Sequence, residues 1–357
     1  MSTQANKLNQ LDTLWYTRCP VPTALGIAVQ QGWLEEALAG RGTAVKSLRE
    51  SDQRAVRESH FDHTLQNSVR HGGNIPALWA RAAGSATRLI GLSWADETQR
   101  ILTLPTSGIR TPRDLKGRRF GLPKWINARI DFARAQAIRG LENALRLDGL
   151  EVSDVELVDF VIEQGQSEAP AERVAGTNVF GGQRRSGGHA AELVGLLRGE
   201  VDAIFLKGAI AAQLAQLFGL HTVIDTGVHP EPLVRSNNGT PRALTVDSHL
   251  VEQHFDVAVD IVDQVLRAQE WARANPEDTR RFLARESNTS EYWVTAAYGQ
   301  DAHQRLDTSL SEANIAGLQD FADFLLRWEF LPAAVDVRGW IDARPFDAAL
   351  ARRLRAA

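Results

Sequence analysis

Short apolar runs alternate with helical patterns along the chain as far as about residue 250, and this alternation limits the possible folds most. The runs expected as strands are 87–94, 100–104, 155–162, 201–205, 221–226 and 242–247. Helical patterns fall between them, among them 126–146, 189–198 and 209–218. Strands that alternate with helices predict an α/β protein with mainly parallel sheets. Beyond residue 250 the pattern is helical, and capping-box spacing from Ser309 to Glu312 predicts one helix start.

The length of 357 residues exceeds what a single hydrophobic core usually serves, so we expect two domains. The turn-rich segment 105–112, which contains two prolines and a glycine, predicts a boundary between them.

Composition excludes several classes of protein. Forty basic residues against 44 acidic ones give a net charge of −4, which argues against a nucleic-acid partner. The one cysteine excludes an intramolecular disulfide. Residues 1–9 are polar and lack the pattern of a secretory signal, and no apolar run is long enough to predict a membrane span. We therefore expect a cytoplasmic monomer with no membrane partner.

The one cysteine, Cys19, stands directly before Pro20-Val21-Pro22 and a helical pattern. The apolar face of that helix is expected to consist of Leu25, Ala28, Val29 and Trp33. Pro22 suits the first turn of such a helix. A helix N-terminus favours negative charge, and hence the thiolate form of a nearby thiol. The alternative is a packing role, because free cysteine is commonly an inert buried residue.

A second group of candidate residues lies between His60 and Pro76. The glycine pair Gly72-Gly73 lets the backbone approach a ligand closely, directly before a helix expected from residue 74 to about 84. Arg70 adds a planar set of donors that fits a sulfinate, carboxylate or sulfonate. The alternative is an ordinary glycine turn with a surface arginine.

Two further patterns are typical of ligand sites. His60 can hold or move a proton near pH 7, and its spacing to His63 is compatible with a metal on a helix. A pair without a third ligand is insufficient for zinc, so we expect no metal site. The glycine-rich segment 181–188 has the composition of a phosphate cradle but lacks the lysine and hydroxyl that end a P-loop. It can be a second wall of an anion site, a lid or a plain loop.

Two segments together resemble the 2′-hydroxybiphenyl-2-sulfinate desulfinase family. They are Tyr16-x-x-Cys19-Pro20-Val21-Pro22 and His60-Phe61, followed by Arg70-x-Gly72-Gly73-x-Ile75-Pro76. Weaker similarity covers nearly the whole chain. The resemblance implies an α/β, two-lobed fold of the type II periplasmic-binding-protein kind with the ligand cleft between the lobes. In that fold, residues 1–105 and 222–357 would form the first lobe, which carries the site, and 106–221 the second.

The resemblance also implies roles for individual residues. Cys19 would be the essential thiol, His60 its proton partner and Arg70 the anchor for the sulfinate. The substrate-binding residues would be Thr17, Phe61, Gly72 and Gly73, with Phe61 as an apolar wall and Gly73 offering its backbone N–H. Thr17 and Arg18 stand where the family has serine and asparagine.

The activity implied is hydrolytic C–S cleavage of an organic, aromatic sulfinate that releases sulfite, with no cofactor and no metal. Cys19 could protonate the carbon that bears sulfur, or its thiolate could attack sulfur; the sequence leaves both open. Two other functions remain as alternatives. One is non-catalytic binding of a sulfonate or related organic anion, and the other is a related lyase such as an aromatic-acid decarboxylase.

Overall fold

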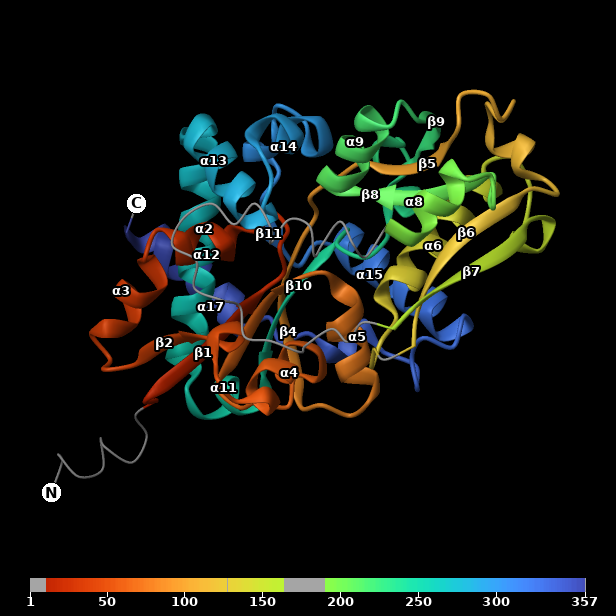
Figure 1. The fold of residues 1–357 in the computed structure, drawn as a ribbon. Coiled ribbons are helices and arrows are strands. Elements are labelled where there is room, and N and C mark those ends of the chain that lie inside the picture. The colour runs from red at the N-terminus through yellow and green to blue at the C-terminus, as the bar shows by residue number, and fades with distance from the viewer. Residues whose placement is uncertain (1–10, 127, 164–189, 357) are drawn as a thin grey trace, which may run out of the picture.

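The computed structural model describes residues 11–126, 128–163 and 190–356 of the chain. Two β-sheets lie side by side, one in each half of the molecule, with helices packed around both (Figure 1). The expected α/β fold with two lobes is confirmed. The glycine-rich segment 181–188, weighed above as a second wall of an anion site, a lid or a plain loop, lies outside the described residues.

The first sheet has six strands in the order β11-β4-β10-β3-β1-β2. Their bounds are Thr13–Arg18 (β1), Ala44–Ser47 (β2), Ser68–Gly72 (β3), Thr87–Ser93 (β4), Arg242–Asp247 (β10) and Thr308–Ser309 (β11). The second sheet has five strands in the order β7-β6-β8-β5-β9. These are Gln99–Thr103 (β5), Arg119–Trp125 (β6), Glu156–Ile162 (β7), Ala203–Lys207 (β8) and His221–Asp225 (β9).

The expectation of mainly parallel sheets is wrong. β1 pairs parallel with β2 and β3, and β6 pairs parallel with β7 and β8. The strands that enter each sheet after a crossing between lobes run the other way. β10 pairs antiparallel with β3 and β4, and β5 pairs antiparallel with β8 and β9. Each crossing delivers a strand from the opposite side, so both sheets are mixed.

Strand membership also moves the expected lobe boundaries. The chain changes sheet between β4 and β5, at residues 94–98, and returns between β9 and β10, at residues 226–241. β5 and β9 therefore belong to the second sheet, although the expected boundaries place all of β5, and all of β9 except His221, in the first lobe. The turns at 105–112 follow β5 and lie within the second lobe. A short apolar run shows that a strand forms but not which sheet it joins.

Helices cover the sheets and join the lobes. Those of the first lobe are Ala24–Gln30 (α2), Trp33–Ala39 (α3), Arg54–Asp62 (α4), Asn74–Ala82 (α5), Ser248–Gln253 (α11), Phe255–Ala274 (α12), Pro276–Ser287 (α13), Glu291–Tyr298 (α14), Glu312–Arg327 (α15), Val337–Trp340 (α16) and Arg344–Ala356 (α17). Those from the second half are Phe132–Arg146 (α6), Ala190–Leu197 (α8), Gly208–Leu217 (α9) and Pro232–Arg235 (α10).

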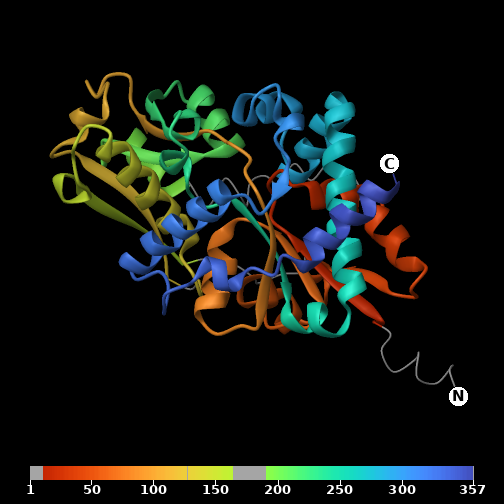
Figure 2. The same cartoon turned by 180° about the vertical axis from the view of Figure 1, so that it is seen from behind.

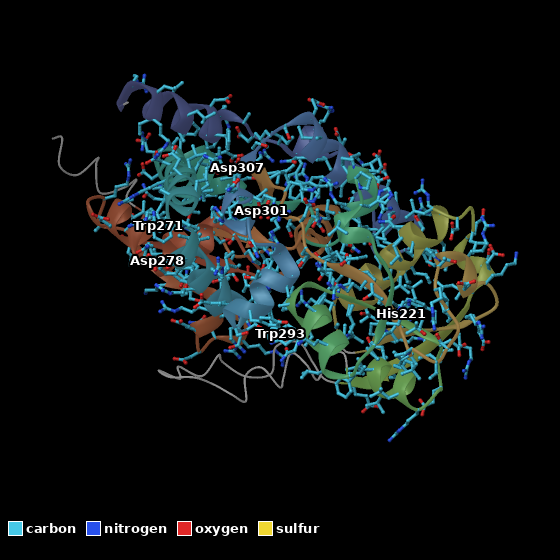
Figure 3. The ribbon with its side chains drawn as sticks, turned by 90° about the horizontal axis from the view of Figure 1, so that it is seen from above. His221, Trp271, Asp278, Trp293, Asp301 and Asp307 are labelled. Carbon is cyan, nitrogen blue, oxygen red and sulfur yellow. The ribbon has the colours of Figure 1, made fainter. Side chains whose placement is uncertain are left out.

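One hydrophobic core continues from lobe to lobe. It joins Ile75 and Leu89 of the first lobe to Phe120 and Ile138 of the second, and Phe321 of α15 packs into the same cluster. Figure 2 shows the C-terminal helices running along the back of both halves. On another side, α14, which carries Trp293, packs beside α9 of the second lobe (Figure 3). The lobes therefore contact each other in more places than at the two crossings.

Three helix starts differ from expectation. The helix after Cys19 begins at Ala24, behind an N-cap at Thr23, and a left-handed Gly32 (φ 74°) divides the predicted helix into α2 and α3. α6 begins at Phe132 instead of residue 126, and its N-cap is Asp131. Ser311, not Ser309, caps α15. In each case a side-chain or backbone cap fixes the boundary. None of the helices in the described part of the chain is both long and apolar enough to cross a membrane.

Candidate active site

The expected site residues meet at one edge of the first sheet. β1 and β3 are parallel neighbours, with Thr17 opposite Arg70 and Arg18 opposite His71. Cys19 follows β1 and Gly73 follows β3, so both leave the sheet at the carboxyl ends of adjacent strands. In open α/β sheets such an edge is the usual place for a ligand.

Arg70 is the charged centre of this edge. Its Nη2 donates a hydrogen bond to the Cys19 sulfur at 3.1 Å, and its Nη1 donates to the carbonyl of Gly73 at 2.7 Å. The side chain is 3% exposed, and within the described chain Nε has no hydrogen-bond partner. Burial lowers the pKa of Arg70, while the facing Cys19 raises it. The guanidinium thus keeps unused N–H groups beside the thiol, as an anion site requires.

Gly72 and Gly73 leave room for side chains that pack against the backbone at these two positions. A Cβ at Gly72 would lie 2.5 Å from the Cys19 sulfur, so only glycine lets the thiol pack here. A Cβ at Gly73 would lie 2.6 Å from Oδ1 of Asn238, which comes from the second crossing. The glycine pair therefore fits the thiol and the crossing segment against the N-terminus of α5.

His60 contacts Thr17. Its Nδ1 and the Thr17 hydroxyl share a hydrogen bond of 2.7 Å, and Phe61 packs edge-on against the imidazole with ring centres 4.7 Å apart. Thr17 and Cys19 are two positions apart along one extended segment, so their side chains leave on the same side. Desolvation, followed by the charge of Arg70, holds the His60 pKa well below its usual value. His60 is therefore neutral at pH 7 and connects to the thiol region through a hydroxyl.

The helix that follows Cys19 begins five residues later, at Ala24. Thr23 caps α2 by accepting the N–H of Gly26 at 3.0 Å, and three residues, Pro20-Val21-Pro22, separate this cap from Cys19. The expectation that Pro22 lies in the first turn of the helix is wrong, since Pro22 precedes the N-cap Thr23 and lies outside the helix. The positive group that touches the sulfur is the Arg70 side chain.

Residues of the two crossings also reach the site, and no motif in the sequence indicates their role. Oδ1 of Asn238 accepts the N–H of Ile75 at 3.3 Å. Lys207, at the end of β8, donates to the carbonyl of Asn238 and forms an ion pair with Glu97 of the first crossing. The Asn238-Gly239 dipeptide predicts a turn. It does not predict that the turn lies over the start of α5.

Among the described residues, no three His, Cys, Asp or Glu side chains lie together in a way that could hold a metal ion. His63, the proposed partner of His60 in such a pair, ends α4 in the left-handed conformation (φ 52°).

This fold and site define a class: a two-lobed, type II periplasmic-binding-protein-like protein with a thiol against a buried arginine. No family model matches the chain. It is 30% identical over 355 residues to the 2′-hydroxybiphenyl-2-sulfinate desulfinase of Rhodococcus erythropolis, covering 92% of this chain and 91% of that one. The chain belongs to the 2′-hydroxybiphenyl-2-sulfinate desulfinase family.

Solved structures agree with this assignment. A cysteine-to-serine variant of the desulfurization enzyme DSZB in complex with biphenyl-2-sulfinic acid matches with a TM-score of 0.73 and 27% identity, over 96% of this chain and 99% of that one. The periplasmic aliphatic sulphonate binding protein SsuA from Escherichia coli matches with a TM-score of 0.64 and 16% identity, over 92% and 97%. The second likeness supports the fold alone.

Proposed function

We propose that this protein is a sulfinate desulfinase that hydrolyses the C–S bond of an aromatic sulfinate and releases sulfite without a cofactor. The observation that carries the proposal is the contact of 3.1 Å between the Arg70 guanidinium and the Cys19 sulfur. Family membership gives the reaction class, and this contact supplies a reactive group and an anion anchor in one place.

Arg70 would bind the sulfinate. A sulfinate presents two oxygens that share one negative charge, and a guanidinium offers paired donors that match them. Arg70 is held by Gly73 and surrounded by protein, which strengthens its interaction with an anion relative to water. The sulfur atom of the substrate would then lie beside the Cys19 thiol.

The overall reaction adds water: the sulfinate R–SO2⁻ and H2O give R–H and HSO3⁻. In one route the Cys19 proton moves to the carbon as the C–S electron pair does, sulfur dioxide leaves and is hydrated, and the thiolate regains a proton. In the other, the thiolate attacks sulfur, the carbon leaves with the electron pair and takes a proton, and water hydrolyses the S–S bond of the intermediate. Both need a proton path, for which Thr17 and neutral His60 are placed.

The direct test incubates the purified protein with a panel of aryl sulfinates and measures sulfite and the desulfinated product. We expect both products in equal amounts from the wild type. Cys19→Ser should release no sulfite while its affinity for the sulfinate stays within a few-fold. Near-normal sulfite release by Cys19→Ser contradicts the proposal. Binding without product by the wild type indicates a ligand carrier, and carbon dioxide release from an aromatic acid indicates a lyase.

A cytoplasmic location and a monomeric state belong to the same proposal and stay predictions. Cell fractionation tests the location, and sedimentation equilibrium tests the state of assembly.

A further inference from the structure

A second arginine of the first sheet is buried without a partner. Arg242 begins β10 and is completely inaccessible to solvent. In the part of the chain that the structure describes, its Nε, Nη1 and Nη2 all lack a hydrogen-bond partner. A buried charge with unsatisfied donors is strongly unfavourable unless something pairs with it. This arginine therefore points to a group that the protein chain does not itself supply.

Other unpaired polar atoms lie in the same row of the sheet. Ser93 of β4 is directly opposite Arg242 on one side and Thr308 of β11 on the other, so the three side chains share one face. His71 joins them, since its Nε2 shares a hydrogen bond of 3.0 Å with the Ser93 hydroxyl. Among the described residues, Nδ1 of His71 and the hydroxyl oxygen of Thr308 have no partner, and both side chains are buried.

This row is separate from the candidate active site. Arg70 is opposite Thr245 on β10, an odd number of positions from Arg242, so the two arginines lie on opposite faces of the sheet. Cys19 contacts Arg70 and belongs to that other face. An anion held by Arg242 would therefore not occupy the place of a substrate held by Arg70.

The charges around Arg242 leave one positive charge uncompensated. Glu97 has a carboxylate close by, since a Cβ at Gly239 would lie 3.2 Å from its Oε1 and 4.0 Å from Arg242 Nε, but Glu97 forms an ion pair with Lys207. Burial and the Glu97 charge raise the pKa of the neighbouring Tyr298, while Arg242 lowers it. Burial, together with Arg242 and Arg70, lowers the His71 pKa to about 3, so His71 is neutral at pH 7. If Ser93 donates to Nε2, the proton of neutral His71 is on Nδ1 and can be donated.

We propose that the first lobe binds a small inorganic anion, a halide such as chloride, between the Arg242 guanidinium and Nδ1–H of His71. The donor set is one cationic and one neutral N–H group, which suits a monovalent anion. Leu244, which is opposite His71 and two positions from Arg242, shares this face and belongs to the buried hydrophobic core, so a single atom suits the place better than an organic anion. The anion would neutralise the buried charge of Arg242 and so stabilise the first lobe.

The test compares thermal unfolding in chloride, bromide and gluconate at one ionic strength. A ligand bound only by the folded state raises the melting temperature as its concentration rises. We expect chloride and bromide to raise it for the wild type and for Arg70→Met, and to have no such effect on Arg242→Met. Loss of the halide effect in Arg70→Met, with the effect kept in Arg242→Met, overturns the proposal.

Crystals of the wild type grown in bromide test for the bound anion directly, so this test does not depend on whether Arg242→Met folds. We expect an anomalous difference peak between Arg242 and His71 of the wild type. A water molecule without anomalous signal at that place, in crystals that contain bromide, overturns the proposal. An anomalous peak beside Arg70 and none beside Arg242 also overturns the proposal.

Discussion

Nη2 of Arg70 lies 3.1 Å from the sulfur of Cys19, a residue 51 positions earlier in the chain. The parallel register of β1 and β3 creates this proximity, because it aligns Thr17 with Arg70 and brings both strand ends to one edge. A packing role alone does not require a buried cation beside a half-exposed thiol. The pairing therefore connects the fold to the proposed chemistry.

Arg70→Met should lower kcat/KM for sulfinates roughly 30- to 150-fold, since hydrogen bonds from a charged donor contribute about 2–3 kcal/mol in total. Arg70→Lys keeps the charge but loses the paired donors, so its loss should be intermediate. Arg118→Met, a change of an exposed arginine in the second lobe, is the control and should have little effect. Equal kcat/KM for Arg70→Met and the wild type would remove Arg70 from substrate binding.

Gly72→Ala should disable the site, because the new methyl group would lie 2.5 Å from the Cys19 sulfur. We expect a loss of about 1–3 kcal/mol in the free energy of unfolding from this overpacking, along with most of the activity. Gly40→Ala is the matched control, since nothing lies within 4 Å of its Cβ position and its φ is −63°. Urea unfolding and sulfite assays on both variants check this, and an active Gly72→Ala speaks against the close thiol packing.

Thr17→Val should lower kcat more than it changes KM, because it removes the hydroxyl bonded to His60 Nδ1 while keeping the shape of the side chain. Thr17→Ser restores the hydroxyl and should recover most of the rate. A purely structural role for Thr17 predicts instead equal stability losses and no change in the pH profile of kcat. Measuring that profile for the three proteins separates the two roles.

Stability should fall as pH decreases below about 6.5. The folded protein holds the pKa values of His60, His63 and His71 below the usual 6.5, so the unfolded chain binds more protons there. Each histidine contributes up to about 1.4 kcal/mol per pH unit, and the contribution is fully present only above the unfolded pKa. His63→Asn removes one of these histidines, so it should reduce the slope by up to about 1.4 kcal/mol per pH unit. Asparagine is chosen because it tolerates the left-handed conformation at that position. Urea unfolding between pH 5 and 7.5 measures the slope, and an unchanged slope in His63→Asn contradicts this assignment.

Lys207→Met should destabilise the protein by about 3–5 kcal/mol, because it leaves the buried Glu97 without its cation. Glu97→Gln combined with Lys207→Met should recover part of the loss, since it removes the unpaired charge. A double-mutant cycle by urea unfolding measures the coupling. Additive effects of the two changes would show that the pair does not stabilise the crossings.

The sequence predicted local structure well where one pattern was sufficient. Residues 242–247 form a strand with the expected bounds, and Gly84 follows the end of α5 in a positive φ of 92°. Periodicity does not encode strand direction, so the antiparallel entry of β10 was missed. Nor does it encode which sheet accepts β5. Both depend on the route of the chain between lobes.

For the candidate site, the sequence predicts the residues of the two motifs but not the residues that reach the site from other segments. Arg70 and Cys19 meet as the motifs indicated, because both motifs end adjacent strands. Asn238 and Lys207 were missed, since they reach the site from segments whose sequence indicates only a turn and a strand end. The hydrogen bond from His60 to Thr17 depends on side-chain packing, which residue spacing does not report.

The central place of β10 in the first sheet affects how a nascent chain can fold. β10 separates β3 from β4, yet a ribosome makes it only after all strands of the second sheet. The stretch from β5 to β9 is contiguous and can complete its sheet as soon as it emerges. Strands β1 to β4 are made earlier, but β3 and β4 cannot be joined until β10 is made and pairs with both. The first sheet is therefore begun first and completed last.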